Sequence, residues 1–118
     1  MRFMMMYKPV KDQEGGPPCE EDVSEMGKFV EESYKSGALL STEGLQPPSK
    51  GARVRLAGGK ITVTDGPFAE AKELVGGFAI VRLNSKQEAI EMAKRFLRVA
   101  GDGETEIRQL WEPSDFPA

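Results

Sequence analysis

The stretch from Arg53 to Thr64 limits the possible folds more than any other part of the chain. Its centre is the pair Gly58-Gly59, which can adopt the positive φ angles that a two-residue hairpin turn requires. With that turn, alternate residues of the two strands face one another. The predicted facing pairs are Leu56–Ile61 and Val54–Val63 on one face, and Arg55–Thr62 and Arg53–Thr64 on the other. The sequence therefore predicts a hairpin with one apolar and one polar face.

Apolar periodicity predicts the remaining elements on either side of this hairpin. They are a strand at Phe3–Tyr7, a helix from about Glu20 to Ser36, a strand from about Leu39 to Gly44, a strand from about Leu74 to Leu83, a helix that Ser85 opens and Gly101 ends, and a strand at Glu104–Trp111. Ser85 and Glu88 have the spacing of a capping box. The stripes predicted to be buried include Met26, Val30 and Tyr34 in the first helix, and Ile90, Ala93, Phe96, Leu97 and Ala100 in the second.

The element order is strand–helix–strand, hairpin, strand–helix–strand. This order predicts an α+β, ferredoxin-like split βαβ fold with an antiparallel sheet, an inserted β-hairpin and two helices on one face. The 118 residues form one predicted domain, 1–118. The opposite face of the sheet would still carry apolar residues, so we expect a second copy to cover it in a dimeric, α/β-barrel-like assembly.

Charge and composition limit the possible partners and compartments. The net charge is −3 and the isoelectric point about 5.1, which argues against a nucleic-acid partner. The apolar N-terminal segment, Phe3 to Tyr7, is too short for a signal peptide or a membrane span. The chain has one cysteine, Cys19, so it contains no internal disulfide. We therefore expect a cytoplasmic protein with no membrane partner.

The absence of histidine excludes several kinds of active site. A Ser-His-Asp or Cys-His nucleophilic system needs an imidazole. A histidine-bearing zinc site is excluded for the same reason, and one cysteine cannot form a thiolate site. A magnesium or calcium site built from carboxylates stays open, although no EF-hand spacing or acidic cluster supports one. We therefore expect no metal and no cofactor.

Two motifs resemble a known family. They are "EGLQPP" from Glu43 to Pro48, and "VTDGPFAEAKELVGGFAIV" from Val63 to Val81. Together with the N-terminal strand they resemble the DGPF subgroup of the YCII-related family over nearly the whole chain. The resemblance implies a small bacterial cytoplasmic protein and a dimer whose sheets pack face to face. Some relatives accompany or are fused to extracytoplasmic-function sigma factors, and no settled reaction comes with the resemblance.

The chain departs from that resemblance at one position. Simpler YCII-like proteins carry a histidine on the first helix, which together with an aspartate has suggested an active site. Counting back from the glycine that ends this helix places Met26 at the equivalent position. The histidine part of that site therefore does not carry over, whereas the aspartate part is matched by Asp65.

Asp65 has two possible roles at the "DGPF" corner. Gly66 precedes Pro67, which favours an extended Gly66 and a rigid corner. The Asp65 carboxylate could accept backbone N–H bonds within this turn. Alternatively, the corner could hold Asp65 in a cleft opposite Glu43, where two carboxylates would separate each other's pKa values and suit acid–base chemistry.

Further candidates surround this corner. Arg53 and Arg55 could bind an anion or form a solvated hairpin face, and Lys72 could reach a ligand carboxylate or phosphate. Phe68 could enter the core or line a ligand site, and Tyr7 could line a pocket. Three functions stay open: a small-ligand-binding or regulatory module associated with a sigma factor, a cofactor-independent enzyme using Asp65 and Glu43 on a small anionic or carbonyl substrate, or a purely structural dimer.

Overall fold

The computed structural model describes residues 1–9, 20–66 and 75–117 of the chain. The elements in chain order are β1 (Arg2–Pro9), α1 (Glu20–Lys35), β2 (Leu39–Gly44), the short 3-10 helix η2 (Pro48–Lys50), β3 (Ala52–Ala57), β4 (Lys60–Asp65), β5 (Gly77–Arg82), α2 (Lys86–Ala100), β6 (Gly103–Gln109) and the 3-10 helix η3 (Pro113–Asp115). None of the helices in these ranges is long and apolar enough to cross a bilayer.

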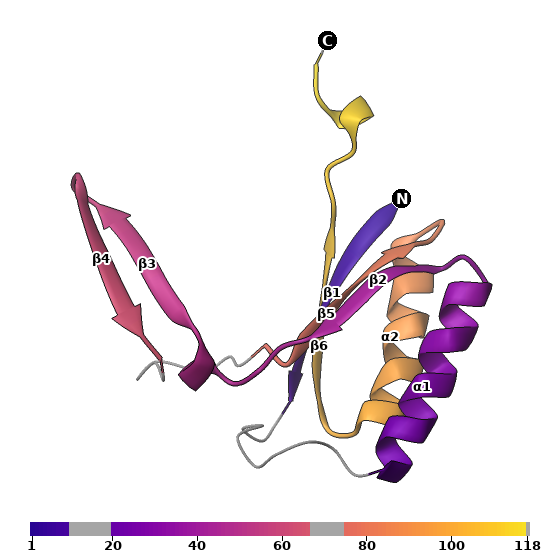
Figure 1. The fold of residues 1–118 in the computed structure, drawn as a ribbon. Helices are drawn as coiled ribbons and strands as arrows, with labels where there is room; N and C mark the ends of the chain where they lie inside the picture. The colour runs from indigo at the N-terminus through magenta and orange to yellow at the C-terminus, as the bar shows by residue number, and fades with distance from the viewer. Residues whose placement is uncertain (10–19, 67–74, 118) are drawn as a thin grey trace.

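The main sheet has four antiparallel strands in the order β2-β5-β1-β6. When the hairpin is set aside, this is the strand order of a ferredoxin-like split βαβ fold, as predicted. β5 lies between β2 and β1, which agrees with its apolar residues on both faces. Helices α1 and α2 lie on the same side of the sheet (Figure 1).

The core lies between the two helices and one face of the main sheet. Phe3 and Val81 are its largest fully buried side chains, and they face one another across β1 and β5. Met92 of α2 is buried against them, and Phe29 and Val30 of α1 pack at the margin. Few side chains among the described residues are fully buried. Stability therefore depends strongly on each of them.

The β3–β4 hairpin forms a separate two-stranded sheet, called the arm below (residues 52–65). Its observed register contains all four predicted facing pairs. Gly58 and Gly59 have φ values of 58° and 78°, so both central residues of the turn have the positive φ that the Gly-Gly pair predicted. Figure 1 shows the arm extending away from the main sheet and its helices.

Three details differ from the sequence prediction. The buried face of α2 is formed by Ala89, Met92 and Ala93, with Phe96 beside them, so the buried stripe is rotated from the predicted one. In α1, Tyr34 is exposed and Ser33 is buried. At the start of α2, the Ser85 hydroxyl accepts a hydrogen bond from the Glu88 N–H, but the Glu88 carboxylate accepts one from the Asn84 N–H instead of the Ser85 N–H. The reciprocal half of the predicted capping box is therefore displaced by one residue.

Candidate functional site

A cavity of about 330 Å³ lies between the main sheet and the two helices. Its floor is a row of residues that face one another across the four strands: Gly44 of β2, Gly77 of β5, Tyr7 of β1 and Thr105 of β6. Two of these four residues have no side chain. The sheet therefore leaves space beneath the helices at this end. At its other end, the larger side chains of the core fill the space between the sheet and the helices.

The close approach of backbone atoms explains one of the glycines. A Cβ on Gly77 would lie 2.9 Å from the carbonyl oxygen of Glu43, so β2 and β5 could not keep their separation with a larger residue. A Cβ on Gly44, by contrast, would meet no heavy atom within 4 Å. Gly44 thus leaves open space at the cavity without being required by packing.

The cavity walls are mostly apolar. Met26, Phe29 and Val30 line it from α1, and Met92 and Phe96 line it from α2. The methionines are flexible, which lets such a wall adapt to ligands of different shape. Met26 presents a thioether to the cavity wall, at the position where the sequence resemblance leads us to expect a histidine in simpler YCII-like proteins.

Tyr7 is held in place by packing on two sides. Its ring contacts Phe96 edge to face with a centroid separation of 5.2 Å. The absence of a side chain on Gly103 makes room for the ring, because a Cβ there would lie 2.7 Å from the Tyr7 Cε1 atom. The Tyr7 hydroxyl donates a hydrogen bond to the Asp102 carbonyl at 3.3 Å. Burial and the nearby charge of Asp102 raise the Tyr7 pKa, so the phenol stays neutral and can accept a hydrogen bond from a ligand.

Two threonines in the cavity lining differ in their hydrogen bonds. Thr42 donates to the carbonyl oxygen of Phe78 at 3.0 Å. The Thr105 Oγ1 atom is buried, and no partner for it exists within the described ranges. Buried hydroxyls are normally hydrogen-bonded, so Thr105 offers a polar group that a ligand could satisfy. Neither threonine was predicted from the sequence, because no local signal distinguishes a cavity threonine from an ordinary strand threonine.

The two candidate carboxylates belong to different sheets. Glu43 is at the end of β2 and contributes to the cavity lining, although its pairing with Phe78 assigns its side chain to the face away from the helices. Asp65 ends β4 in the arm and is not among the residues that line the cavity. No hydrogen bond to the Asp65 side chain is found in the described part of the chain. Both its turn-forming role and its pairing with Glu43 stay predictions.

The other predicted ligand residues are dispersed. Arg53 and Arg55 lie on the polar face of the arm and are exposed. Tyr7 lines the cavity, whereas Lys72 and Phe68 lie outside the described residues. Among residues 1–9, 20–66 and 75–117, no group of three or more Asp, Glu or Cys side chains could hold a metal ion.

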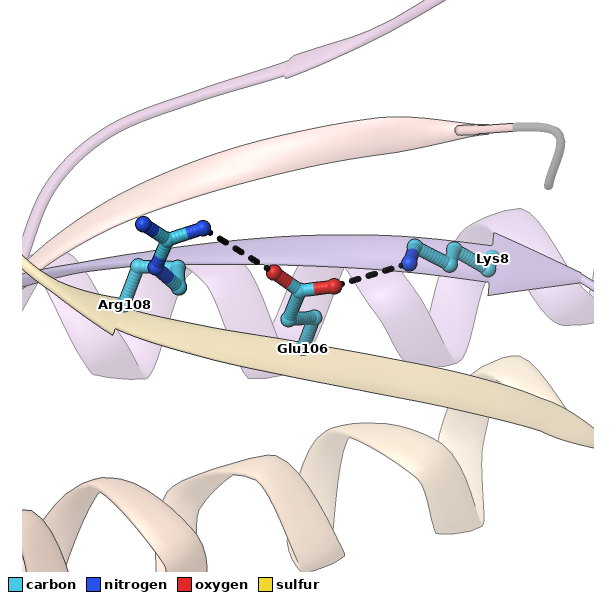
Figure 2. Close-up of polar contacts among 3 residues, drawn as sticks. All are labelled: Lys8, Glu106 and Arg108. Atoms are coloured by element: carbon cyan, nitrogen blue, oxygen red, sulfur yellow. Dashed lines mark hydrogen bonds and ion pairs between the residues drawn. The ribbon is translucent and has the colours of Figure 1, made fainter.

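A charged cluster crosses β1 and β6 on the helix-free face of the sheet. Glu106 accepts a hydrogen bond from the Lys8 ammonium at 2.8 Å, and Arg108 lies 3.5 Å from its other oxygen (Figure 2). The hydrogen bond from Lys8 and the positive charges lower the Glu106 pKa. The Lys8 side chain is only 12% exposed. The cluster therefore ties the central strand to the edge strand and lies beside Met6, the strand partner of Glu106.

The main sheet, the helices and the cavity between them define an α+β protein of ferredoxin-like topology with a partly open apolar cavity. The chain matches the family model of the YCII-related domain over residues 1–114, and it belongs to that family. Uncharacterized protein R00369 of Rhizobium meliloti (strain 1021) is 33% identical over 94 residues, which cover 77% of this chain and 73% of that protein. Family membership is confirmed, and assignment to the DGPF subgroup stays a prediction.

Proposed function

We propose that this protein is a small-ligand-binding module whose cavity receives a compact, largely apolar molecule. The observation that carries the proposal is the cavity of about 330 Å³ between the sheet and both helices. This volume is at the lower end of the range for small-molecule sites. Its apolar walls would supply most of the affinity by removing ligand surface from water.

Two hydroxyl groups would orient the ligand. The Thr105 hydroxyl has no protein partner within the described residues, and the Tyr7 hydroxyl already donates a hydrogen bond to the Asp102 carbonyl. Thr105 can therefore donate to a ligand oxygen, while Tyr7 can accept from a ligand hydroxyl. A small aromatic alcohol has the matching combination of an apolar body and one polar group.

The cavity favours binding over acid–base catalysis. Its wall carries the Met26 thioether, where the resemblance leads us to expect a histidine in simpler relatives, and Asp65 is not among its lining residues. The Tyr7 phenol is a poor base near neutral pH, because its raised pKa favours the protonated form. A regulatory role would require that the ligand-bound state be read by a partner, and the sequence resemblance implies a sigma factor as that partner.

A matched pair of variants tests the proposal. The probe is 2-naphthol, and its binding is measured by fluorescence titration and by thermal shift. Gly44→Leu places a side chain in the open space at the cavity and is expected to abolish saturable binding. Gly27→Leu adds the same side chain on the exposed surface of α1, where a Cβ also meets no atom within 4 Å, and should bind the probe like the unmodified protein.

Two outcomes would contradict the proposal. The first is the absence of saturable binding by 2-naphthol and by a panel of other aromatic and aliphatic alcohols. The second is binding that Gly44→Leu and Gly27→Leu leave equally intact, since the probe would then lie outside the cavity. Circular dichroism on both variants checks that each has kept its fold.

A further inference from the structure

The cavity has few polar side chains, and most of their hydrogen-bond donors already have an acceptor. Thr42 donates to a backbone carbonyl at 3.0 Å, and the Tyr7 hydroxyl donates to another at 3.3 Å. Apart from Thr105 and Glu43, the other described lining residues are methionine, phenylalanine, aliphatic residues and glycine. Within the described lining, Thr105 is therefore the one side chain whose donor is available to a ligand.

The strand register puts the Thr105 hydroxyl on the helix side of the sheet. Thr105 lies opposite Tyr7 across β6 and β1, and residues paired in this way point to the same side of a sheet. The Tyr7 ring contacts Phe96 of α2, so both side chains face the helices. A buried hydroxyl without a partner is unfavourable. A ligand oxygen that accepts from Thr105 would remove this cost.

The shape of the cavity indicates where the rest of the ligand lies. The row that begins at Thr105 continues through Tyr7 to Gly77 and Gly44, and the two glycines leave space over β5 and β2. Adjacent strands lie about 4.8 Å apart, so roughly 10 Å separates Thr105 from Gly77. A molecule of about two fused rings with one oxygen substituent fits this span, with its oxygen at β6 and its apolar body over the glycines.

The charges at the cavity favour a neutral ligand. No Lys or Arg side chain lines the cavity within the described ranges. Glu43 is the single Asp or Glu of the described lining, and its pairing with Phe78 assigns its side chain to the helix-free face. A ligand carboxylate or ammonium group would therefore lose its water without gaining an opposite charge.

We propose that the cavity selects neutral molecules that carry an oxygen acceptor, and that Thr105 makes this selection by donating a hydrogen bond to that oxygen. The inference rests on the proposed ligand-binding function and adds the chemical class of the ligand. Alcohols and ketones belong to this class, whereas hydrocarbons and carboxylates of the same shape do not. A serine at this position would keep the selection, and a valine would remove it.

Two probes of nearly equal size test the hydrogen bond by fluorescence titration. 2-Naphthol carries a hydroxyl group where 2-methylnaphthalene carries a methyl group. Thr105→Val should weaken 2-naphthol binding by about 10-fold, because the ligand oxygen loses its donor, and should change 2-methylnaphthalene binding by less than about 3-fold. Thr105→Ser should keep the ratio of the two dissociation constants within about 3-fold of the unmodified protein.

Thr42→Val is the matched control for this experiment. It removes a hydroxyl from the same cavity lining, but that hydroxyl already donates to the Phe78 carbonyl. The ratio of the two dissociation constants should therefore change by less than about 3-fold. Both probes are titrated against the same variant, so partial unfolding weakens both and leaves their ratio unchanged.

A second pair of probes tests the preference for a neutral ligand. 2-Acetylnaphthalene is a neutral ketone, and 2-naphthoate is an anion of nearly the same shape. At neutral pH the unmodified protein should bind the ketone at least about 10-fold more tightly than the anion, because the anion loses hydration without an ion pair.

Three results would overturn the proposal. They are a probe ratio that Thr105→Val leaves unchanged, a ratio that Thr42→Val changes as much as Thr105→Val does, or binding of 2-naphthoate as tight as that of the ketone. If Gly44→Leu abolishes binding of 2-methylnaphthalene in any of these cases, the cavity is still a ligand site and only the selection is wrong. If no probe binds, the proposed function and the selection are both wrong.

Discussion

Gly66 packs directly against the carbonyl group of Pro48. A Cβ atom at Gly66 would overlap the Pro48 carbonyl oxygen, so only glycine fits there. The Gly66 N–H also donates a hydrogen bond to the Gly51 carbonyl at 3.0 Å. The glycine of "DGPF" and the second proline of "EGLQPP" are thus neighbours at the base of the arm. This contact gives a structural reason for the two motifs to occur together.

Gly66→Ala is expected to loosen the base of the arm. The added methyl group meets backbone and not a movable side chain, so we expect a local cost of about 1 to 3 kcal/mol. Hydrogen exchange of the β3 and β4 amides measures that local opening. The control is Gly51→Ala, because a Cβ at Gly51 would contact the same Pro48 oxygen at an ordinary 3.7 Å. Equal exchange rates in the two variants would contradict the steric explanation.

Of the two variants Thr105→Val and Thr42→Val, only Thr42→Val should lower the stability of the fold. Thr105→Val removes a buried hydroxyl that has no described partner. We therefore expect the free energy of unfolding to be unchanged or about 1 kcal/mol higher. Thr42→Val removes the hydrogen bond to the Phe78 carbonyl, so the folded protein should become about 1 kcal/mol less stable. Urea denaturation measures both. A destabilised Thr105→Val variant would show that the hydroxyl has a partner in the folded protein.

The Glu106 carboxylate should make stability depend on acid pH. Its pKa is lowered from 4.5 in the folded state, chiefly by the hydrogen bond from Lys8. The stabilising contribution is therefore present above about pH 4.5 and is lost as pH falls through the lowered folded-state pKa. Glu106→Gln should flatten the free energy of unfolding against pH in that acid range, measured by urea denaturation.

The matched control for the pH experiment is Glu32→Gln on α1. Glu32 is exposed and has no ion pair among the described residues. This variant should keep the pH dependence of the unmodified protein. The explanation fails if the two glutamine variants show the same curve.

Phe3→Ala should destabilise the protein far more than Tyr34→Ala. Phe3 is 1% exposed at the centre of the core, and truncating such a side chain costs about 3 to 5 kcal/mol. Tyr34 is 45% exposed on α1, and its loss should cost less than about 1 kcal/mol. Denaturant unfolding compares them directly. A large effect at Tyr34 would support the helix face predicted from the sequence over the observed one.

The sequence by itself determined the order of elements, the arm and its register. These features depend on neighbours in the chain, because the Gly58-Gly59 turn and a period of two residues leave one consistent pairing. The positions of Gly37 and Gly101 at helix ends were also predictable, and both have positive φ, at 83° and 97°. The ferredoxin-like order follows from these local signals, because few arrangements connect such elements.

Only the tertiary structure decided the cavity and the helix faces. The cavity floor takes one residue from each of four strands, and Gly44, Gly77, Tyr7 and Thr105 meet only because the strands pair in one register. The buried faces of α1 and α2 are rotated by a fraction of a turn from the predicted ones. Several rotations of each helix would bury a similar apolar area, and only packing against the sheet selects one of them. Long-range pairing likewise brought Gly66 to Pro48. It also put Asp65 in the two-stranded sheet of the arm and Glu43 in the four-stranded sheet, an assignment that no local pattern in the chain encodes.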